Sequence, residues 1–432
     1  MDFSVTRSSG GLIPPSEPTP SEVLDLSVID RLPVLRCNAR TLHVFRYGPS
    51  TALRIRAALS KALVAYYPLA GRLKESNQRE LQIECSGEGV WFVEACANCA
   101  LDTVNYFDNV MSIPFDKLLP QHPLEDEGLD PLVLMQVTRF TCDGYVMGLT
   151  FCHSICDGLG AAQFLNAVGE LARGLEHLSV VPLWHRDFLP PLPPPPPPPP
   201  LREACSNSLT NLPPGPPPMP DYQLEQTNTD IPLDQINRLK QKFQESTGQT
   251  CSSFEIVAAT LWSRRTKAII LEKDTEVKLI FFANCRQLLP STLPKGFYGN
   301  CFFPVTITAS SEELAWSSIA DVVKLVQEAK SRLPNEFAKW TKGDLLKEGI
   351  DPFAPPLIYT TLFISEWGKL GFNQVDYGHG PPVHVVPMQG SSIIPVGIVG
   401  SLPLPKKGIR LMTWCVKKAH QQPFLDEMAK LR

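Results

Sequence analysis

The sequence predicts a mixed α/β protein built from two domains, and three observations support this fold class. With 432 residues, the chain is longer than one hydrophobic core usually spans. Short apolar runs typical of strands alternate with segments of helical periodicity in both halves. Between the halves, residues 190–220 are so rich in proline that neither a helix nor a sheet can include them. The predicted domains are therefore residues 1–189 and residues 221–432.

The proline-rich segment is predicted to be a stiff linker between the domains. Residues 193–200 are eight consecutive prolines, and a second proline cluster follows at residues 213–220. Such runs adopt the extended polyproline II conformation. Because adaptor domains with aromatic grooves bind polyproline II, a non-catalytic scaffold that recruits partners through this segment is an alternative function.

Composition and charge narrow the class of protein. An apolar fraction of 43% and a charged fraction of 19% are typical of a soluble globular protein. The formal net charge of −4 indicates no general attraction to nucleic acid or to anionic membranes. The 12 cysteines follow no disulfide framework, and the N-terminus lacks the apolar core of a signal peptide, so we expect reduced thiols and a cytoplasmic protein. Cys96 and Cys99 form one CxxC pair, but zinc needs four ligands, so no metal site is predicted.

The N-terminal half alternates strands and helices. A strand is predicted over residues 41–47, and a helix over residues 53–66, where apolar side chains recur on one face. Residues 80–95 predict a hairpin, because strand-like residues flank the turn-forming sequence SGEG. Residues 132–152 predict a second hairpin that turns at the sequence CDG.

The segment YVMGLTFCHSICDGLG holds the first candidate functional residue. Its strand-forming part, residues 145–151, ends just before His153. A turn-forming cluster of Asp157, Gly158 and Gly160 follows, and then helical periodicity resumes, so His153 is predicted at a strand-to-helix corner. A histidine there can act as a general base, because its pKa lies near physiological pH. The competing interpretation is a core histidine with Asp157 as a helix cap, and spacing alone favours it.

The C-terminal half alternates strands and helices in the same way. A strongly apolar helix is predicted over residues 254–269, with Ser252 and Ser253 placed to cap its start. A buried strand is predicted over residues 276–289 and leads to Arg286. The other predicted elements are strands at 222–231 and 357–367, helices at 232–246 and 319–330, a hairpin at 393–418 and a short C-terminal helix.

Four motifs occur in order along the chain: HSICDG, FYGNC, ISEWGKLGF and VDYGHGPP. Together with YYPLAGRL, ECSGEGVWFVEA and QVTRFTCDG, they make the sequence resemble the plant BAHD acyl-CoA-dependent acyltransferases over essentially its whole length. A lone HxxxD would be weak evidence, whereas the ordered set is specific. Within the family, the second half looks closest to the grass hydroxycinnamoyl-CoA:monolignol transferases, and the benzoyl and acetyl transferases of taxane and benzyl alcohol metabolism are also similar.

The resemblance implies a more specific fold and reaction. It implies two domains like chloramphenicol acetyltransferase, each a mixed β-sheet flanked by helices, joined by a proline-rich crossover. A channel between the domains would admit acyl-CoA from one face and a small-molecule acceptor from the other, with His153 midway. Acyl-CoA would be a co-substrate, and no bound cofactor, metal or acyl-enzyme would be needed. Family members are usually monomers.

The resemblance also implies roles for individual residues. His153 would be the general base that deprotonates an alcohol as it attacks the thioester. Ser365 and Trp367 match positions near the oxyanion of the tetrahedral intermediate and would donate hydrogen bonds to it. Asp157 would be structural, forming a salt bridge with Arg286 that holds the corner bearing His153.

Two further groups of residues match family positions outside the acid–base chemistry. Ser252 and Ser253 would cap a helix, contact CoA or do both, and capping is the interpretation that the sequence alone favours. Tyr298 and Asn300, on either side of a glycine, would shape the wall of the channel and contact substrate or CoA.

The turn DYGHG departs from the family's usual DFGWG. Asp376, Gly378 and Gly380 are retained and would order a loop far from the chemistry. Tyr377 replaces Phe, and His379 replaces Trp, which shrinks a packing residue and adds a titratable group. The eight-proline run is a second departure, because it is longer than a crossover needs.

The predicted reaction leaves alternatives. Hydroxycinnamoyl donors such as p-coumaroyl- or feruloyl-CoA, with a monolignol acceptor, are the first choice by resemblance. Benzoyl or acetyl donors, and an amine acceptor, are next. A covalent mechanism that pairs Cys152 or Cys156 with His153 is a further alternative. Adjacent strand residues point to opposite faces, which argues against Cys152.

Overall fold

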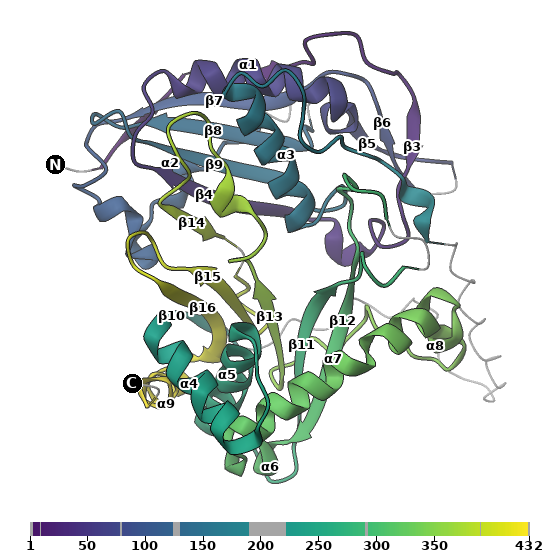
Figure 1. Cartoon of the computed structure of the whole chain (residues 1–432), viewed down its shortest axis with the longest axis vertical. Helices are drawn as coiled ribbons and strands as arrows, with labels where there is room; N and C mark the ends of the chain where they lie inside the picture. The colour runs from purple at the N-terminus through teal and green to yellow at the C-terminus, as the bar shows by residue number, and fades with distance from the viewer. Residues whose placement is uncertain are drawn as a thin grey trace, which may run out of the picture.

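The computed structural model describes residues 3–8, 10–77, 80–123, 130–189, 222–289, 293–388 and 390–430. The predicted linker, residues 190–220, lies outside the described residues. Two large sheets form the body of the molecule, one from each half of the chain, with the N-terminal half above the C-terminal half in Figure 1. Within the described ranges, no helix is long and apolar enough to cross a membrane.

The N-terminal sheet mixes parallel and antiparallel pairs. Its strands, in spatial order, are β1 (Val5–Arg7), β7 (Val90–Ala97), β8 (Val133–Arg139), β9 (Tyr145–Cys152), β4 (Asn38–Phe45) and β14 (His384–Pro387), and β2 (Gly11–Ile13) also pairs with β7. β8 and β9 form the hairpin predicted over residues 132–152. The turn closes where Phe140 N–H donates to the Gly144 carbonyl, and Asp143 takes a positive φ of 58°.

The hairpin predicted over residues 80–95 is wrong. Both strands form, but they join different sheets: β6 (Leu81–Glu84) pairs with β3 (Val23–Asp25) and β5 (Arg72–Glu75), whereas β7 joins the large sheet. The connecting backbone donates elsewhere, because Cys85 N–H bonds the Glu22 carbonyl and Gly89 N–H bonds the Ala70 carbonyl. Long-range backbone partners therefore override the local turn signal.

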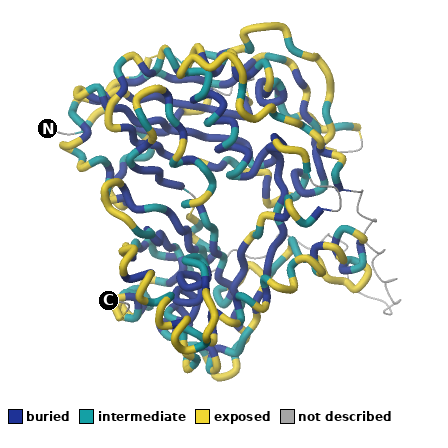
Figure 2. Tube along the Cα trace, viewed as in Figure 1, coloured by how far each residue is buried: buried dark blue, intermediate teal, exposed yellow. Residues whose placement is uncertain are grey.

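Helices cover the outer face of the N-terminal sheet. The helix predicted over residues 53–66 is α1 (Thr51–Ala65), and the one after the HSICDG motif is α3 (Gly158–Ala172). Their apolar faces are buried against the sheet in one core that continues into the domain interface. A short helix, α2 (Phe115–Leu118), contacts β9 where Gly148 lies against the Leu118 carbonyl. In Figure 2 the strands under these helices are almost entirely buried.

The C-terminal sheet has one face toward helices and one toward the N-terminal half. Its strands, in spatial order, are β10 (Leu224–Pro232), β16 (Gly408–Lys417), β15 (Val396–Ser401), β13 (Thr361–Glu366), β11 (Glu276–Asn284) and β12 (Phe302–Ser310). The helices are α4 (Leu233–Thr247), α5 (Ser253–Ile269), α6 (Ser311–Trp316), α7 (Ile319–Thr341), α8 (Asp344–Lys347) and α9 (Lys418–Ala429). Successive side chains of β16 point to opposite faces of this sheet. Leu411 packs with the helices, whereas Met412 packs with the N-terminal core.

One strand crosses between the halves. β14 comes from the predicted C-terminal domain, residues 221–432, yet pairs antiparallel with β4 and completes the N-terminal sheet. In Figure 1 it lies in yellow-green at the lower edge of that sheet. Its apolar side chains are buried there. The pairing also continues beyond both ends of the strand, because Val383 N–H donates to the Val44 carbonyl and Met388 N–H donates to the Arg40 carbonyl. The interface between the halves therefore includes shared sheet hydrogen bonds as well as side-chain contacts.

Candidate active site

His153 lies at the predicted corner between a strand and a helix. β9 ends at Cys152, and α3 begins after its N-cap residue Asp157. His153 N–H donates to the Cys37 carbonyl at 2.8 Å, and Ser154 Oγ donates to the Leu35 carbonyl at 3.0 Å. The first two residues of the corner are thus tied to the segment that leads into β4.

The Asp157 carboxylate points into the protein. Its Oδ1 accepts from Arg286 Nη2 at 2.9 Å and from Gly160 N–H at 3.0 Å, and its Oδ2 accepts from Cys301 N–H at 3.3 Å. The expected salt bridge with Arg286 is therefore present, and Asp157 also caps α3. Arg286 donates a second bond, at 2.7 Å, to the Gly299 carbonyl, so the pair joins the corner to the backbone just before β12.

A second buried carboxylate, Asp30, was not predicted from the sequence. Its Oδ1 accepts from both the side-chain Nδ2 of Asn300, at 2.7 Å, and the Asn300 backbone N–H, at 3.1 Å. The same Asn300 Nδ2 donates to the His153 carbonyl at 2.8 Å. Asn300 is fully buried. It therefore holds the backbone of His153, whereas the resemblance implies a residue of the channel wall at this position.

Arg186 is the other residue that sequence reasoning missed. Its Nη2 donates to the Ile155 carbonyl at 2.6 Å, and its Nε lies 3.0 Å from Asp30 Oδ2. Its guanidinium lies over the Trp184 ring, 4.1 Å from the centroid, a favourable cation–π arrangement. The only sequence signal was a charged pair in the segment WHRD beside the proline-rich linker. Nothing in that segment indicates a partner as distant as Asp30.

Tyr298 is also buried behind the corner. Its ring contacts Tyr66, with centroids 5.1 Å apart, and lies 5.2 Å from the Arg186 guanidinium. Its carbonyl approaches Gly160 so closely that a Cβ at that glycine would lie 1.8 Å from the oxygen. Only glycine fits there. Tyr298, like Asn300, thus supports the corner.

The surroundings of His153 favour its neutral form. Burial lowers its pKa from the ordinary value, although the carboxylates of Asp157 and Asp30 act in the opposite direction. Its Nδ1 is buried and has no hydrogen-bond partner among the described residues. A neutral imidazole can accept a proton, as a general base must.

Ser365 and Trp367 come from the facing sheet. Ser365 is a partly exposed residue of β13, opposite Ile398, and Trp367 N–H continues the pairing by donating to the Val399 carbonyl at 2.8 Å. The loop after Trp367 packs on the corner, because Leu370 fills the space beside Gly158. The segment bearing the expected oxyanion donors is thus brought directly against the HSICDG motif.

The two cysteines next to His153 are poor nucleophiles. Burial raises the pKa of the Cys152 thiol to about 11 and raises the pKa of the Cys156 thiol well above its usual range. Thiolate, and not thiol, is the reactive form. Protonated, buried thiols therefore argue against the covalent Cys–His alternative.

Ser252 caps α5 as the sequence predicted. Its Oγ accepts from Glu255 N–H at 3.2 Å, and its own N–H donates to Glu255 Oε2 at 2.9 Å, which completes a capping box. Ser253 is the first residue of the helix and is partly buried. Both serines lie in the C-terminal half, at the start of the helix that packs behind the sheet.

The DYGHG turn packs on the N-terminal half. Asp376 Oδ1 accepts from the backbone N–H groups of Gly378, His379 and Gly380 at 2.7, 3.1 and 2.9 Å. Both glycines have positive φ, which the turn requires. Arg54 of α1 donates to the Tyr377 carbonyl and lies 3.2 Å from the ring Nε2 of His379. The exposed His379 thus finds partners in place of a larger ring.

Comparison with known proteins places the chain among acyltransferases. Residues 3–401 match the family described as the Transferase family. The chain is 41% identical to acyl transferase 4 of Oryza sativa subsp. japonica, over 99% of each chain. It is 39% identical, again over 99% of each chain, to a myricetin 3-O-glucosyl 1,2-rhamnoside 6'-O-caffeoyltransferase of Crocosmia x crocosmiiflora. It is 35% identical to the 3'-N-debenzoyl-2'-deoxytaxol N-benzoyltransferase of Taxus canadensis, over 98% of this chain and 95% of the relative.

Solved structures share the fold. Vinorine synthase superposes with a TM-score of 0.74 at 20% identity, covering 99% of this chain and 98% of its own. The TRI101 protein of F. graminearum, in complex with coenzyme A and deoxynivalenol, superposes with a TM-score of 0.75 at 13% identity, over 95% and 99% of the two chains. At these identities the likeness concerns the fold alone.

Proposed function

This chain belongs to the BAHD transferase family, and we propose that it moves an acyl group from CoA to the hydroxyl of a small alcohol, with His153 as general base. The observation that carries this proposal is the His153 corner. Three side chains from distant segments hold this corner in place. Asn300 and Arg186 donate to backbone carbonyls of the corner, and Arg286 donates to Asp157, the residue that caps α3. Burial keeps the imidazole neutral and able to take a proton, because it lowers the pKa of His153.

The proposed reaction needs no covalent enzyme intermediate. Because Nδ1 of His153 is buried, Nε2 is the nitrogen that would face substrate. Nε2 takes the alcohol proton while the alcohol oxygen bonds to the thioester carbonyl carbon, and the carbonyl oxygen becomes an oxyanion. When the intermediate collapses, the C–S bond breaks, the ester forms, and the CoA thiolate takes the proton back from the imidazolium. Such acid–base catalysis typically contributes about 10²–10⁴-fold in rate.

Ser365 and Trp367 are proposed to stabilise the oxyanion. Their segment faces the corner across the domain interface, where a hydroxyl and an indole N–H can donate to a developing negative charge. Loss of one such donor typically costs about 10²–10³-fold in rate. Asp157 and Arg286 are proposed as positioning residues, because both are occupied with each other and with backbone groups.

The names of the relatives reduce the range of candidate substrates. Those relatives include a caffeoyltransferase, an N-benzoyltransferase and a taxadien-5-alpha-ol O-acetyltransferase. We propose a hydroxycinnamoyl donor, p-coumaroyl- or feruloyl-CoA, and an aromatic alcohol such as a monolignol as acceptor. Benzoyl or acetyl transfer, and transfer to an amine, are the second choice, supported by the taxane relatives.

Acyl-CoA is proposed as a co-substrate, in keeping with the coenzyme A bound by the TRI101 protein. The proposed reaction needs no resident cofactor, because substrate or His153 supplies each proton and electron pair. Ser252 and Ser253 are retained as candidate CoA contacts beside the capping role of Ser252. The enzyme is proposed to act as a monomer.

The test measures release of free CoA thiol by purified protein. The donors are p-coumaroyl-, feruloyl-, benzoyl- and acetyl-CoA, and the acceptors are coniferyl alcohol, benzyl alcohol and an amine. The expected result is release that depends on the acceptor and that His153→Ala lowers by about 10²–10⁴-fold. His177→Ala, which changes an exposed histidine, is the matched control and should behave as wild type.

A thermal unfolding curve accompanies each variant. If His153→Ala retains the wild-type rate while folded, His153 is not the base. If no pair of substrates releases CoA from folded wild-type protein, the transfer reaction proposed here fails for these substrate classes.

A further inference from the structure

We propose that a cavity between the two sheets, here named the Trp414 cavity, binds the aromatic ring of a substrate and so sets the enzyme's preference for aromatic groups. The cavity has a volume of about 340 Å³, within the range of small-molecule sites. Among the residues that line it are Phe115, Met388, Met412, Trp414, Gln226 and Ser392. This inference rests on the proposed acyl transfer, because it names the part of the substrate that the enzyme recognises.

The lining has the chemistry of an aromatic site. Trp414 and Phe115 offer rings for stacking or edge contact, and the thioethers of Met388 and Met412 make favourable contacts with ring edges. The described lining residues are all uncharged, so a charged acyl group such as a dicarboxylate would find no residue of opposite charge there. Gln226 supplies an amide and Ser392 a hydroxyl, which suit the hydroxyl or methoxy groups of a phenolic ring.

The apolar walls are incompletely packed. Phe115, Met388 and Trp414 are each only partly buried, although large apolar side chains at a domain interface are normally covered. Gly390, which also lines the cavity, lies close against Trp414, because a Cβ at Gly390 would fall 2.1 Å from the indole Cε2. The apolar surface left open between these residues is therefore available to a ligand.

Strand registers place the cavity on the same face as the proposed oxyanion donors. Ser365 lies opposite Ile398 on β15, and Ile398 lies opposite Met412 on β16. Directly opposed residues of neighbouring strands point to the same face of a sheet. Met412 and Ile398 both belong to the core that joins the two halves. Ser365 and the Trp414 cavity therefore lie on the same, interdomain face of the C-terminal sheet.

The N-terminal sheet gives the separation from His153. β14 lies two strands from β9, and the Met388 N–H bonds to Arg40, which is opposite Thr150. With strands about 4.8 Å apart and a rise of about 3.4 Å per residue, Met388 lies roughly 14 Å from the backbone of His153. The His153 side chain and the reacting ester group occupy part of that span. A phenyl ring on a three-carbon chain would cover the rest.

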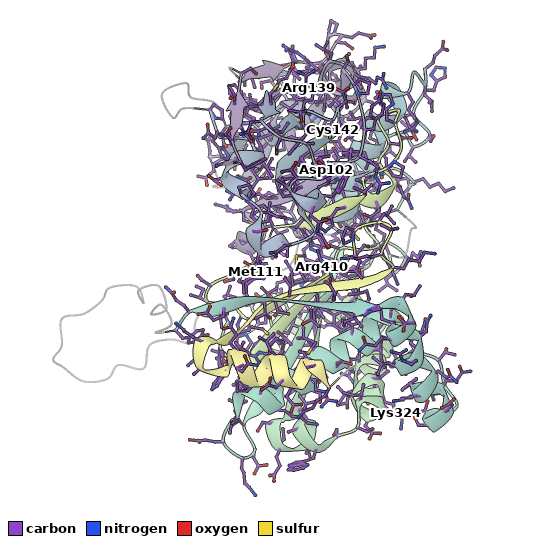
Figure 3. All side chains as sticks on the ribbon, turned by 90° about the vertical axis from the view of Figure 1, so that its left-hand side faces the viewer. Asp102, Met111, Arg139, Cys142, Lys324 and Arg410 are labelled. Atoms are coloured by element: carbon purple, nitrogen blue, oxygen red, sulfur yellow. The ribbon has the colours of Figure 1, made fainter. Side chains whose placement is uncertain are left out.

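An ion cluster holds the outer wall of the cavity in place. Arg410 donates to Asp230 Oδ1 and Oδ2, both at 2.7 Å, and to Asp108 Oδ1 at 2.9 Å. Val110, two residues after Asp108, and Met412, two residues after Arg410, both line the cavity. Figure 3 shows Arg410 at the level where the two halves of the molecule meet. The cluster thus clamps an N-terminal loop onto the C-terminal sheet beside the cavity.

The ring could come from the donor or from the acceptor, and one experiment separates the two. Protein carrying ¹³C-methyl methionine is titrated with p-coumaroyl-CoA alone and with coniferyl alcohol alone, with acetyl-CoA and 1-hexanol as ring-free controls. The Met388 and Met412 signals, assigned with Met388→Leu and Met412→Leu, should move through ring-current shifts with one aromatic ligand. The exposed Met111, visible in Figure 3, should not move.

A kinetic arm tests whether the cavity sets specificity. Met388→Trp, which fills the cavity, should lower kcat/KM for the aromatic partner by at least about 10-fold relative to its ring-free counterpart. Met111→Trp, the same change at an exposed site, should leave that ratio unchanged. An equal loss with aromatic and ring-free substrates would overturn the specificity claim.

The outcomes separate this inference from the proposed function. Transfer activity with no movement of Met388 or Met412 would overturn the cavity assignment and leave the acyl transfer standing. Movement of these signals in wild-type protein that transfers no acyl group would support aromatic binding and overturn the proposed reaction.

Discussion

Arg286 Nη2 lies 2.9 Å from Asp157 Oδ1, and this pair joins the corner that carries His153 to the C-terminal half of the chain. Both side chains are mostly buried, and each also bonds backbone groups: Gly160 and Cys301 for Asp157, and Gly299 for Arg286. The motif's aspartate is therefore an anchor for the corner that carries His153, the proposed base, because its carboxylate is taken up by Arg286 and by backbone N–H groups.

Asp157→Asn and Arg286→Met should weaken folding and activity together. Removing one member of a buried ion pair leaves the other uncompensated, at a cost of roughly 3–5 kcal/mol. The double variant should lose less than the sum of the two single losses, in both urea unfolding and kcat, because the residues are in contact. A catalytic role for Asp157 would instead leave Arg286→Met with most of the activity that Asp157→Asn loses.

The rate should depend on pH through His153. Burial lowers the pKa of His153 below its ordinary value of 6.5, so the neutral base persists into mildly acidic solution. We expect kcat/KM to be constant above neutrality and to fall on the acid side with an inflection below pH 6.5. Initial rates between pH 4.5 and 8 would check this, with unfolding monitored at each pH. An inflection above 6.5 would contradict the assignment of the base.

Acid should destabilise the fold through two other buried histidines. Burial lowers the pKa of His43 to about 3 and the pKa of His384 to about 4. In the unfolded chain these two histidines bind protons as the pH falls through about 6.5, whereas in the folded chain they stay neutral there. Their contribution to stability is therefore full above pH 6.5 and falls as the pH drops below it. Each histidine contributes about 1.4 kcal/mol per pH unit in this window.

Urea unfolding between pH 6.5 and 5 measures this slope. His384→Gln should reduce the slope, whereas His177→Gln, at an exposed site, should leave it unchanged. Equal slopes for wild type and His384→Gln would show that His384 is protonated in the folded protein.

The capping box at Ser252 predicts a loss of stability that Ser253 does not share. Ser252→Ala removes the Oγ that accepts from Glu255 N–H and should cost about 1 kcal/mol. Ser253→Ala, one residue along, should change the unfolding free energy by less than about 0.5 kcal/mol. KM for acyl-CoA, measured on both variants, tells capping from binding. A more than twofold rise in KM for Ser252→Ala would indicate that Ser252 contacts CoA as well as capping the helix.

Arg410 should matter more for stability than its neighbour Lys406. Arg410 is 5% exposed and bonds both Asp108 and Asp230, whereas Lys406 meets Asp108 at the surface. Arg410→Met leaves two carboxylates close together and should cost at least about 2 kcal/mol, somewhat below the value for a fully buried pair because Asp230 is part exposed. Lys406→Met should cost less than about 1 kcal/mol. Comparable losses in urea unfolding would show that the cluster is not a clamp.

Local sequence patterns predicted most of the helices and strands. They did not predict which strands pair with each other or which distant side chains support the corner. The helix cap at Ser252 and the strand before His153 depend on neighbours within a few residues, so periodicity and caps reveal them. The hairpin expected over residues 80–95 failed because β6 and β7 take their partners from β3, β5 and β8. Asp30 and Arg186 escaped notice for a related reason, since each supports the corner from far along the chain.

By itself, the sequence determined the family, the two-part α/β architecture, the corner that carries His153 and the caps of α3 and α5. These depend on ordered motifs and short-range periodicity, which survive in the linear order of residues. Only the tertiary structure decided that β14 completes the other half's sheet, that Asn300 holds the His153 carbonyl, and that Trp414 and Met388 leave a cavity between the sheets. Those features arise where segments far apart in the sequence meet, because packing and hydrogen-bond satisfaction there depend on three-dimensional proximity that no local pattern encodes.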